Sequence, residues 1–337
     1  MATIKKHVSA CFQLVTFTCA SIMFALMLYK PLHRFTSYDQ KPTLSSGIPA
    51  HSTPTMVRTG LHINSFSKTD ILKNDFIFEG ELWFEFDPKQ VSIEDIEKFD
   101  LDHGQILERS KPIISQQGKK TLARYLIRAS FQTGLSYKAF PLDNHTIYIA
   151  ITNRFVTAEK LSFVPVDISS IAKSNLLSST CTLDKLMAEA GYVTNSIPLT
   201  DTVLHNNSPQ IIFGIQCNRI DLRHFLNIFL PLLLIFFFTL FAFSLDFNEH
   251  GQMVPTMAAA GVPALLAYRF VIEAVSPDVD YFMLSDYLFF LFLFLVFAIF
   301  IAIVAAVHAS ERVKQLTIIG LYGCMLLSCG ALFYWML

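Results

Sequence analysis

The chain has 337 residues, of which 53% are hydrophobic and only 16% are charged, whereas about 25% of the residues of a typical soluble domain are charged. So little polar surface cannot cover a water-soluble fold of this size, and a formal net charge of −1 argues against a nucleic-acid partner, which requires a basic face. Composition therefore predicts a membrane protein.

The first apolar stretch, Val8–Tyr29, carries no charged side chain over 22 residues, enough for a helix to cross roughly 30 Å of hydrocarbon. We expect residues 1–29 to form an N-terminal transmembrane anchor, because the stretch is long and lacks a clear small-residue cleavage site. A cleaved signal sequence is the alternative. Residues 30–56 are rich in Ser, Thr and Pro without periodicity, which indicates a linker.

Residues 57–220 are more polar and alternate apolar with polar side chains in several short runs. The clearest run places five apolar side chains on one face of a strand: Phe76, Phe78, Leu82, Phe84 and Phe86. Several such runs, separated by Gly, Pro, Asn and Asp, predict an all-β antiparallel sandwich. One short stretch, Thr182–Ala190, has a helical pattern instead.

Residues 221–337 contain four further apolar stretches, and we expect them to form a four-helix transmembrane bundle. Three of the stretches carry no charge, namely Phe225–Leu245, Tyr287–Val307 and Leu316–Leu337. The other stretch, Met253–Ala274, contains Arg269 and Glu273, so we expect neighbouring helices to shield it from lipid.

Basic residues near the apolar stretches predict the orientation in the membrane, because they favour the cytoplasmic side. Lys5 and Lys6 precede the first stretch, and Arg312 and Lys314 precede the last. Placing these residues in the cytoplasm puts the predicted β-sandwich outside. Two arginines on the outer side of the second stretch oppose this orientation, Arg219 and Arg223.

The sequence has no CxxC or HExxH motif, no Gly-rich phosphate loop and no GxSxG motif. We therefore expect no enzyme activity, no catalytic residue, no metal and no cofactor. Four of the six cysteines lie in apolar stretches. The other two, Cys181 and Cys217, are the only pair in residues 57–220, and the sequence leaves open whether they form a disulfide.

Four short motifs follow one another along the chain. They are Gly60 with the run Asp70–Asp87 around Trp83; Phe140-Pro141-Leu142-Asp143 with His145 after it; Asn227-Ile228-Phe229-Leu230-Pro231 with Arg219 12 residues before Pro231; and Ser276-Pro277 followed by Tyr281 and Asp286-Tyr287-Leu288-Phe289. These motifs, an outer sandwich and four apolar helices together resemble the pentameric ligand-gated ion channels, the Cys-loop receptor family. The resemblance covers residues 57–337. The short loop before the last helix, and the lack of cysteines flanking Phe140–Asp143, resemble the prokaryotic members.

The resemblance implies a homopentamer in the bacterial inner membrane, crossing it several times with the sandwich in the periplasmic or extracellular space. Its expected partners are copies of itself, a small-molecule ligand or proton, inorganic ions and membrane lipid. It also implies a gating junction where the ligand-binding sandwich meets the channel helices, with an ion pair between Asp143 and Arg219. The junction residues are Phe140, Pro141, Asp143, Arg219, Pro277 and Tyr281.

Alignment with the pore helix of the family gives a set of residues near the lumen: Gln252, Thr256, Ala260, Pro263, Ala267 and Phe270. Only Thr256 supplies a hydroxyl group, which departs from the cation-selective members. Pro255 and Pro263 are expected to disrupt this helix. Arg269 and Glu273 are spaced to pair with one another along the helix, and a role in ion selectivity is the alternative.

Two other functions stay open at this point. A chain that keeps the fold but has lost the pore would be a non-conducting receptor or scaffold, and the apolar pore helix favours that. A membrane-anchored enzyme is the weaker alternative, because no nucleophile–base constellation is present. The sequence identifies neither the ligand nor the ion selectivity, and it does not separate pocket aromatics from core aromatics among Tyr125, Tyr137, Tyr148, Phe163 and Tyr192.

Overall fold

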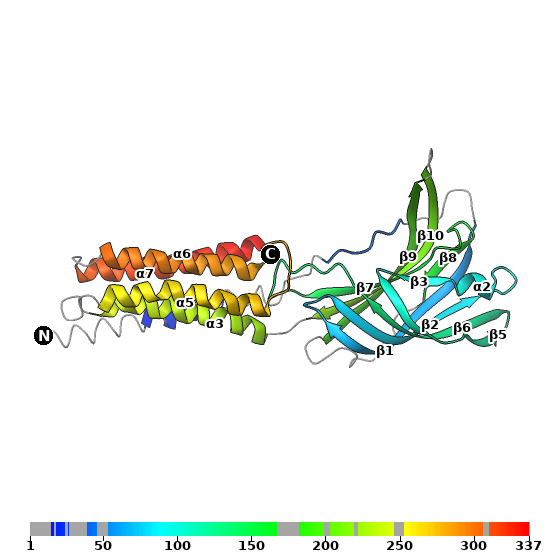
Figure 1. Cartoon of the computed structure of the whole chain (residues 1–337), viewed down its shortest axis with the longest axis horizontal. Coiled ribbons are helices and arrows are strands. Elements are labelled where there is room, and N and C mark those ends of the chain that lie inside the picture. Colours follow the sequence, from blue (N-terminus) through cyan, green and yellow to red (C-terminus); the bar gives the residue numbers. More distant parts are fainter. Residues whose placement is uncertain are drawn as a thin grey trace. The chain divides into compact units, whose positions relative to one another are not determined.

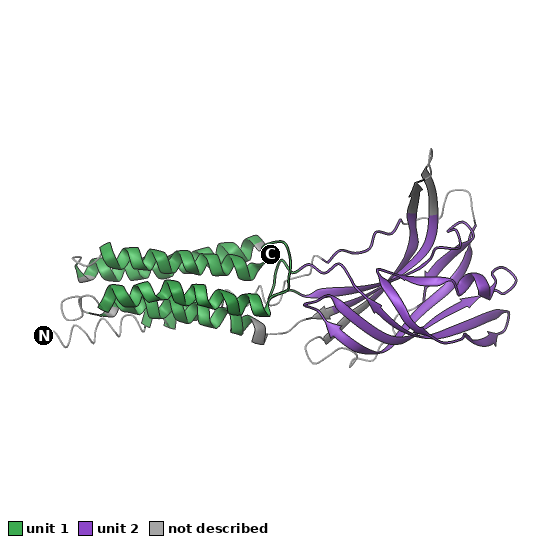
Figure 2. Ribbon diagram, viewed as in Figure 1, with its two compact units in different colours: residues 1–36, 137–143, 221–337 green, residues 37–136, 144–220 purple. Residues whose placement is uncertain are grey.

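The computed structural model describes residues 15–16, 18–23, 26, 39–45, 53–166, 182–198, 203–218, 222–245, 253–305 and 310–336 (Figure 1). Contacts divide the chain into two compact units (Figure 2). Unit 2, residues 37–136 and 144–220, holds the β-sheets. Unit 1, residues 1–36, 137–143 and 221–337, holds the helices together with one loop. The predicted order, a β-sheet region followed by apolar helices, is confirmed.

The described residues of unit 2 form two sheets. The larger one has the strand order β4-β6-β2-β1-β8, with β5 paired to β6; its strands are β1 (Thr55–Asp70), β2 (Asp75–Phe86), β4 (Gly104–Arg109), β5 (Ile113–Gln117), β6 (Lys120–Phe131) and β8 (Leu161–Pro165). The smaller one has the order β3-β7-β10-β9, with β3 (Phe99–Asp102), β7 (His145–Asn153), β9 (Thr182–Pro198) and β10 (Val203–Asn218). A short helix, α2 (Ile93–Ile96), precedes β3.

The core of unit 2 lies between the two sheets. Alternate residues of β2 are buried, including all five apolar side chains that the sequence placed on one face. Phe99 of the smaller sheet has its ring centroid 5.3 Å from that of Phe84 and 5.2 Å from that of Tyr125, both in the larger sheet. The two sheets therefore pack face to face through aromatic side chains.

The helical pattern at Thr182–Ala190 was a wrong prediction, because this stretch is the first half of β9. The strand pairs with β10 along its whole length, from Thr182 opposite Asn218 to Pro198 opposite Val203. A nine-residue helical pattern is too short to be stable alone. The long ladder with β10, which has one register shift between Gln216 and Cys217, provides backbone partners that outweigh such a local preference.

Unit 1 contains, within the described residues, four long helices: α3 (Leu222–Phe241), α5 (Met253–Val275), α6 (Leu284–Ala305) and α7 (Glu311–Met336). A short 3₁₀ turn, η2 (Ala242–Ser244), follows α3. In the part of the chain that the structure describes, three segments are long and apolar enough to cross a membrane: Met253–Val275, Leu284–Ala305 and Arg312–Trp335. The apolar part of α3, Phe225–Phe241, is shorter. Most of the predicted anchor Val8–Tyr29 lies outside the described residues.

Successive helices run in opposite directions. The ring centroids of Phe229, early in α3, and Phe333, late in α7, are 6.0 Å apart, and those of Tyr287, early in α6, and Trp335 are 5.8 Å apart. Figure 1 shows the four helices side by side. This is the antiparallel packing that short connections favour.

The expectation that prolines would disrupt the second of these helices was wrong, since α5 is continuous over 23 residues. Pro255 lies in the first turn, where the missing N–H has no helical acceptor. Pro263 lies inside the helix but is exposed, whereas the buried side chains follow another face: Val254, Ala258, Gly261, Leu265 and Ile272. Pro263 removes one backbone hydrogen bond on the exposed face of α5, and the packing of the buried face stays intact.

Candidate functional site

The loop between β6 and β7, Tyr137–Asp143, clusters with the helices of unit 1 rather than with the sheets. Its backbone forms hydrogen bonds with the connection between α5 and α6. The N–H of Tyr137 donates to the phenol oxygen of Tyr281 at 3.0 Å. The N–H of Leu284 donates to the carbonyl of Lys138 at 2.9 Å, and the N–H of Ser285 to the carbonyl of Phe140 at 3.2 Å.

The motif Phe140-Pro141-Leu142-Asp143 forms the buried end of this loop, and the Phe140–Pro141 peptide bond is cis. The side chain of Asp143 is buried as well. The structure thus brings the Phe140–Asp143 motif to the α5–α6 connection, the segment that contains Pro277 and Tyr281. Arg219 lies outside the described residues, so its pairing with Asp143 stays a prediction.

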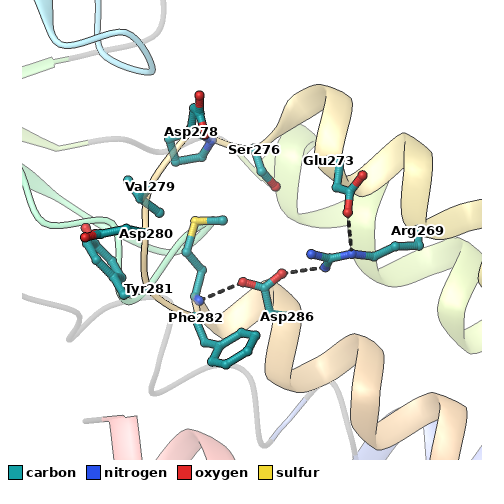
Figure 3. A pocket seen from close by; sticks show the side chains of 11 residues that line it. Arg269, Glu273, Ser276, Asp278, Val279, Asp280, Tyr281, Phe282 and Asp286 are labelled. Atoms are coloured by element: carbon teal, nitrogen blue, oxygen red, sulfur yellow. Dashed lines mark hydrogen bonds and ion pairs between the residues drawn. The ribbon is translucent and has the colours of Figure 1, made fainter.

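A pocket of about 520 Å³ lies beside this connection (Figure 3). Its polar side chains come from the end of α5, the α5–α6 connection and the start of α6. The lining residues are Arg269, Glu273, Ser276, Pro277, Asp278, Val279, Asp280, Tyr281, Phe282, Met283 and Asp286. Four of them are carboxylates and one is a guanidinium, so the pocket is acidic.

Arg269 is the centre of an ion-pair network in this pocket. Its Nε lies 3.0 Å from Glu273 Oε1, the pairing along the helix that the spacing predicted. Its Nη1 lies 2.5 Å from Asp286 Oδ1 on α6, and Figure 3 shows the guanidinium between the two carboxylates. The second contact ties the end of α5 to the start of α6, and a local spacing rule does not reveal it.

The side chains around the ion-pair network form hydrogen bonds at the end of α5 and at the start of α6. The hydroxyl of Ser276 donates to the carbonyl of Ile272 at 2.7 Å in the last turn of α5. Asp286, in the first turn of α6, accepts from the N–H of Met283 at 2.8 Å. A carboxylate is favourable there because the first N–H groups of a helix have no helical acceptors. The same carboxylate therefore caps α6 and binds Arg269.

The predicted pore-lining residues that the structure describes lie on the exposed face of α5, namely Thr256, Ala260, Pro263, Ala267 and Phe270. The Phe270 side chain is 73% exposed. Gln252 lies outside the described residues. Among the described residues, neighbouring helices cover one face of α5, and 22% of its apolar span is buried, against 39% for α6.

The aromatic candidates separate into core and partly exposed residues. Tyr125, Tyr137 and Phe163 are buried, and burial raises the pKa of Tyr125 to about 12. Tyr148 and Tyr192 are half-buried. Tyr148 lines a second pocket of about 420 Å³ in unit 2, and burial raises its pKa too.

Two further expectations concern cysteines and metals. Cys181 lies outside the described residues, as does the side chain of Cys217, so a disulfide between them stays an open question. Among the described residues, no group of three or more His, Cys, Asp or Glu side chains is placed to hold a metal ion.

No protein-family profile matches the sequence, and no curated protein matches it. The main feature of the site is the set of hydrogen bonds between Tyr137–Asp143 and the connection of α5 with α6.

Proposed function

We propose that the chain is a ligand-gated, channel-type membrane receptor. The observation that carries the proposal is the set of hydrogen bonds between the β6–β7 loop and the α5–α6 connection. Through this contact a change in the β-sheet region can reach helix ends without passing through the covalent chain between them.

The proposed mechanism is a shift between two populations of conformations. A ligand or proton bound by the sandwich of unit 2 favours one position of the β6–β7 loop, and hence of Tyr281. Because the Arg269–Asp286 ion pair joins the end of α5 to the start of α6, both helix ends move with the loop. Because the face of α5 opposite its packing face is the proposed pore lining, moving this end changes the lumen.

We further propose that α5 lines the axis of a homopentamer and that α3 and the N-terminal span also cross the membrane. Support comes from the burial of α5, which leaves one face uncovered. That face includes large apolar side chains, Leu266, Phe270 and Val271, together with the smaller pore candidates. The proposed setting is the bacterial inner membrane, with the sandwich in the periplasm or outside the cell.

A second candidate is a receptor or scaffold of the same fold that does not conduct ions. It is favoured by the chemistry of the α5 stripe, where Thr256 is the only hydroxyl among five described pore candidates. Apolar constrictions exclude ions by dewetting, so such a stripe could hold the pore closed permanently.

The test is to purify the full chain into lipid nanodiscs, image single particles, and record currents from planar bilayers across a range of pH and small ligands. Fivefold particles and a stimulated current are expected. Fivefold particles without current under any condition would establish the non-conducting receptor instead. Particles without rotational symmetry would overturn both proposals.

A further inference from the structure

The segment expected to be a linker includes residues that bind to the sheets of unit 2. The N–H of Gln40 donates to the carbonyl of Gly134 at 2.7 Å, and Ser45 and Tyr192 exchange two backbone hydrogen bonds at 3.0 and 3.2 Å. Lys41 forms an ion pair with Glu189 of β9. Residues 39–45 therefore form a strap, anchored at both ends, across unit 2.

The first residue of the strap, Asp39, has a carboxylate surrounded by donors. Its Oδ1 accepts from the N–H of Ser136 at 2.8 Å, and its Oδ2 accepts from the N–H of Thr146 at 2.5 Å. The Nδ1 of His145 lies 3.2 Å from Oδ1. The Asp39 side chain is only 1% exposed.

The donors to Asp39 lie on either side of the β6–β7 loop. Ser136 directly precedes the β6–β7 loop Tyr137–Asp143, and His145 and Thr146 begin the strand that follows it. One carboxylate thus bridges the two ends of the loop. No cysteine lies between Gln132 and Ile151, so no disulfide closes the loop.

A buried carboxylate is costly unless donors compensate for the water it has lost, and hydrogen bonds to an ionised acceptor are stronger than those between neutral groups. Two backbone N–H groups in fixed positions donate to Asp39 and compensate for its lost hydration. Because the carboxylate accepts from the N–H of Ser136 before the loop and from the N–H of Thr146 after it, it sets the distance between the two ends.

We propose that Asp39 is a positioning residue for the β6–β7 loop, clamping its base so that Tyr137, Lys138 and Phe140 present their backbone groups to the α5–α6 connection. The importance of this clamp for gating rests on the proposed function. The clamp itself is tested without any channel activity.

The experiment is amide hydrogen exchange, read by mass spectrometry, on the full chain in nanodiscs. Asp39→Asn replaces one carboxylate oxygen with an NH₂ group, which cannot accept from an N–H. Exchange in peptides covering Ser136–Thr146 is expected to rise about tenfold or more, the effect of losing a charge-assisted hydrogen bond that limits local opening. Peptides from β2 and β6 are expected to stay at the wild-type rate.

Lys41→Gln is the matched control, because it removes an exposed ion pair from the same strap, and such pairs contribute little. It should leave exchange in Ser136–Thr146 unchanged. Asp39→Glu keeps the charge with a longer reach and should show an intermediate rise. It also serves as the milder variant if Asp39→Asn does not assemble.

A uniform rise across both sheets in the Asp39 variants would overturn the proposal, since Asp39 would then stabilise unit 2 as a whole. Wild-type exchange in Ser136–Thr146 for both variants would overturn it as well. Either result leaves the proposed receptor function standing, while a positive result with no ligand-stimulated current would leave the clamp standing without that function.

Discussion

The phenol oxygen of Tyr281 accepts a hydrogen bond from the backbone N–H of Tyr137, although 144 positions separate the two residues in the sequence. This bond joins a loop between two β-strands to the connection between two apolar helices. Here a side chain takes part, whereas the hydrogen bonds of Leu284 to Lys138 and of Ser285 to Phe140 join backbone groups.

Removing the Tyr281 hydroxyl should therefore weaken the contact. We expect Tyr281→Phe to lower the free energy of unfolding by about 0.5–1.5 kcal/mol, the usual net value of one hydrogen bond, and to raise amide exchange at Tyr137. Tyr334→Phe is the control, because that side chain is 84% exposed. Exchange at Tyr137 that equals the wild-type rate would show that the hydroxyl does not hold the loop.

The two carboxylates of the ion-pair network are expected to contribute differently to the free energy of unfolding. The Asp286 side chain is 6% exposed and that of Glu273 is 55% exposed. Asp286→Asn should cost roughly 3 kcal/mol, the lower end of the range for breaking a buried pair, since Arg269 keeps Glu273. Glu273→Gln should cost about 0.3–0.5 kcal/mol. Chemical denaturation in detergent measures both, and equal effects would contradict the assigned geometry.

The packing of α5 depends on a glycine. A Cβ atom at Gly261 would lie 2.3 Å from Thr239 Oγ1 and 2.9 Å from Val296 Cγ1. Gly261→Ala should therefore push α3 or α6 away and cost about 1–3 kcal/mol, as overpacked cores do. Thermal unfolding of the purified protein measures this loss.

The matched control is Gly320→Ala in α7, where an added Cβ meets no atom within 4 Å. That change should stabilise the helix by roughly 0.5–1 kcal/mol. Adding Thr239→Ala to Gly261→Ala should restore part of the lost stability, because it removes the nearest obstacle. No recovery in the double variant would mean that another contact limits the approach.

A substitution of the exposed Phe270 tests whether α5 lines the proposed pore. If an apolar ring of Phe270 side chains closes the lumen by dewetting, Phe270→Ser should raise basal conductance or create it in a silent protein. Because this side chain is 73% exposed among the described residues, the change should not lower the stability of the chain through an internal cavity. Single-channel recording and a pentamer-stability assay are the measurements. Continued silence with a less stable assembly would place Phe270 in a subunit contact instead.

The buried Tyr125 predicts a response to alkaline pH. Burial raises its pKa from 10.0 to about 12, and its hydroxyl has no hydrogen-bond partner among the described residues. Since the unfolded chain loses this proton first, the stability it contributes is complete below pH 10 and is lost as the pH rises towards 12. Because the described residues offer the buried hydroxyl no partner, Tyr125→Phe should be at least as stable as the wild type at neutral pH, and its advantage should grow above pH 10. Identical pH profiles would contradict the assigned burial.

The sequence alone determined the features that repeat along a single element. Alternation along β2 marked its buried face, long apolar runs marked the helices of unit 1, and spacing along α5 placed Arg269 next to Glu273. Each of these follows from the geometry of one strand or one helix, so a short window of residues contains the whole signal.

Contacts between distant parts of the chain required the tertiary structure. Asp286 joins Arg269 across a helix connection, Asp39 bridges the ends of a loop about a hundred positions away, and β9 became a strand because β10 lies beside it. No local periodicity encodes such pairings, since they depend on the path of the chain through space. Hydrogen bonds to β10 decided the conformation of Thr182–Ala190 against its helical pattern, because a short helix is weaker than a long ladder.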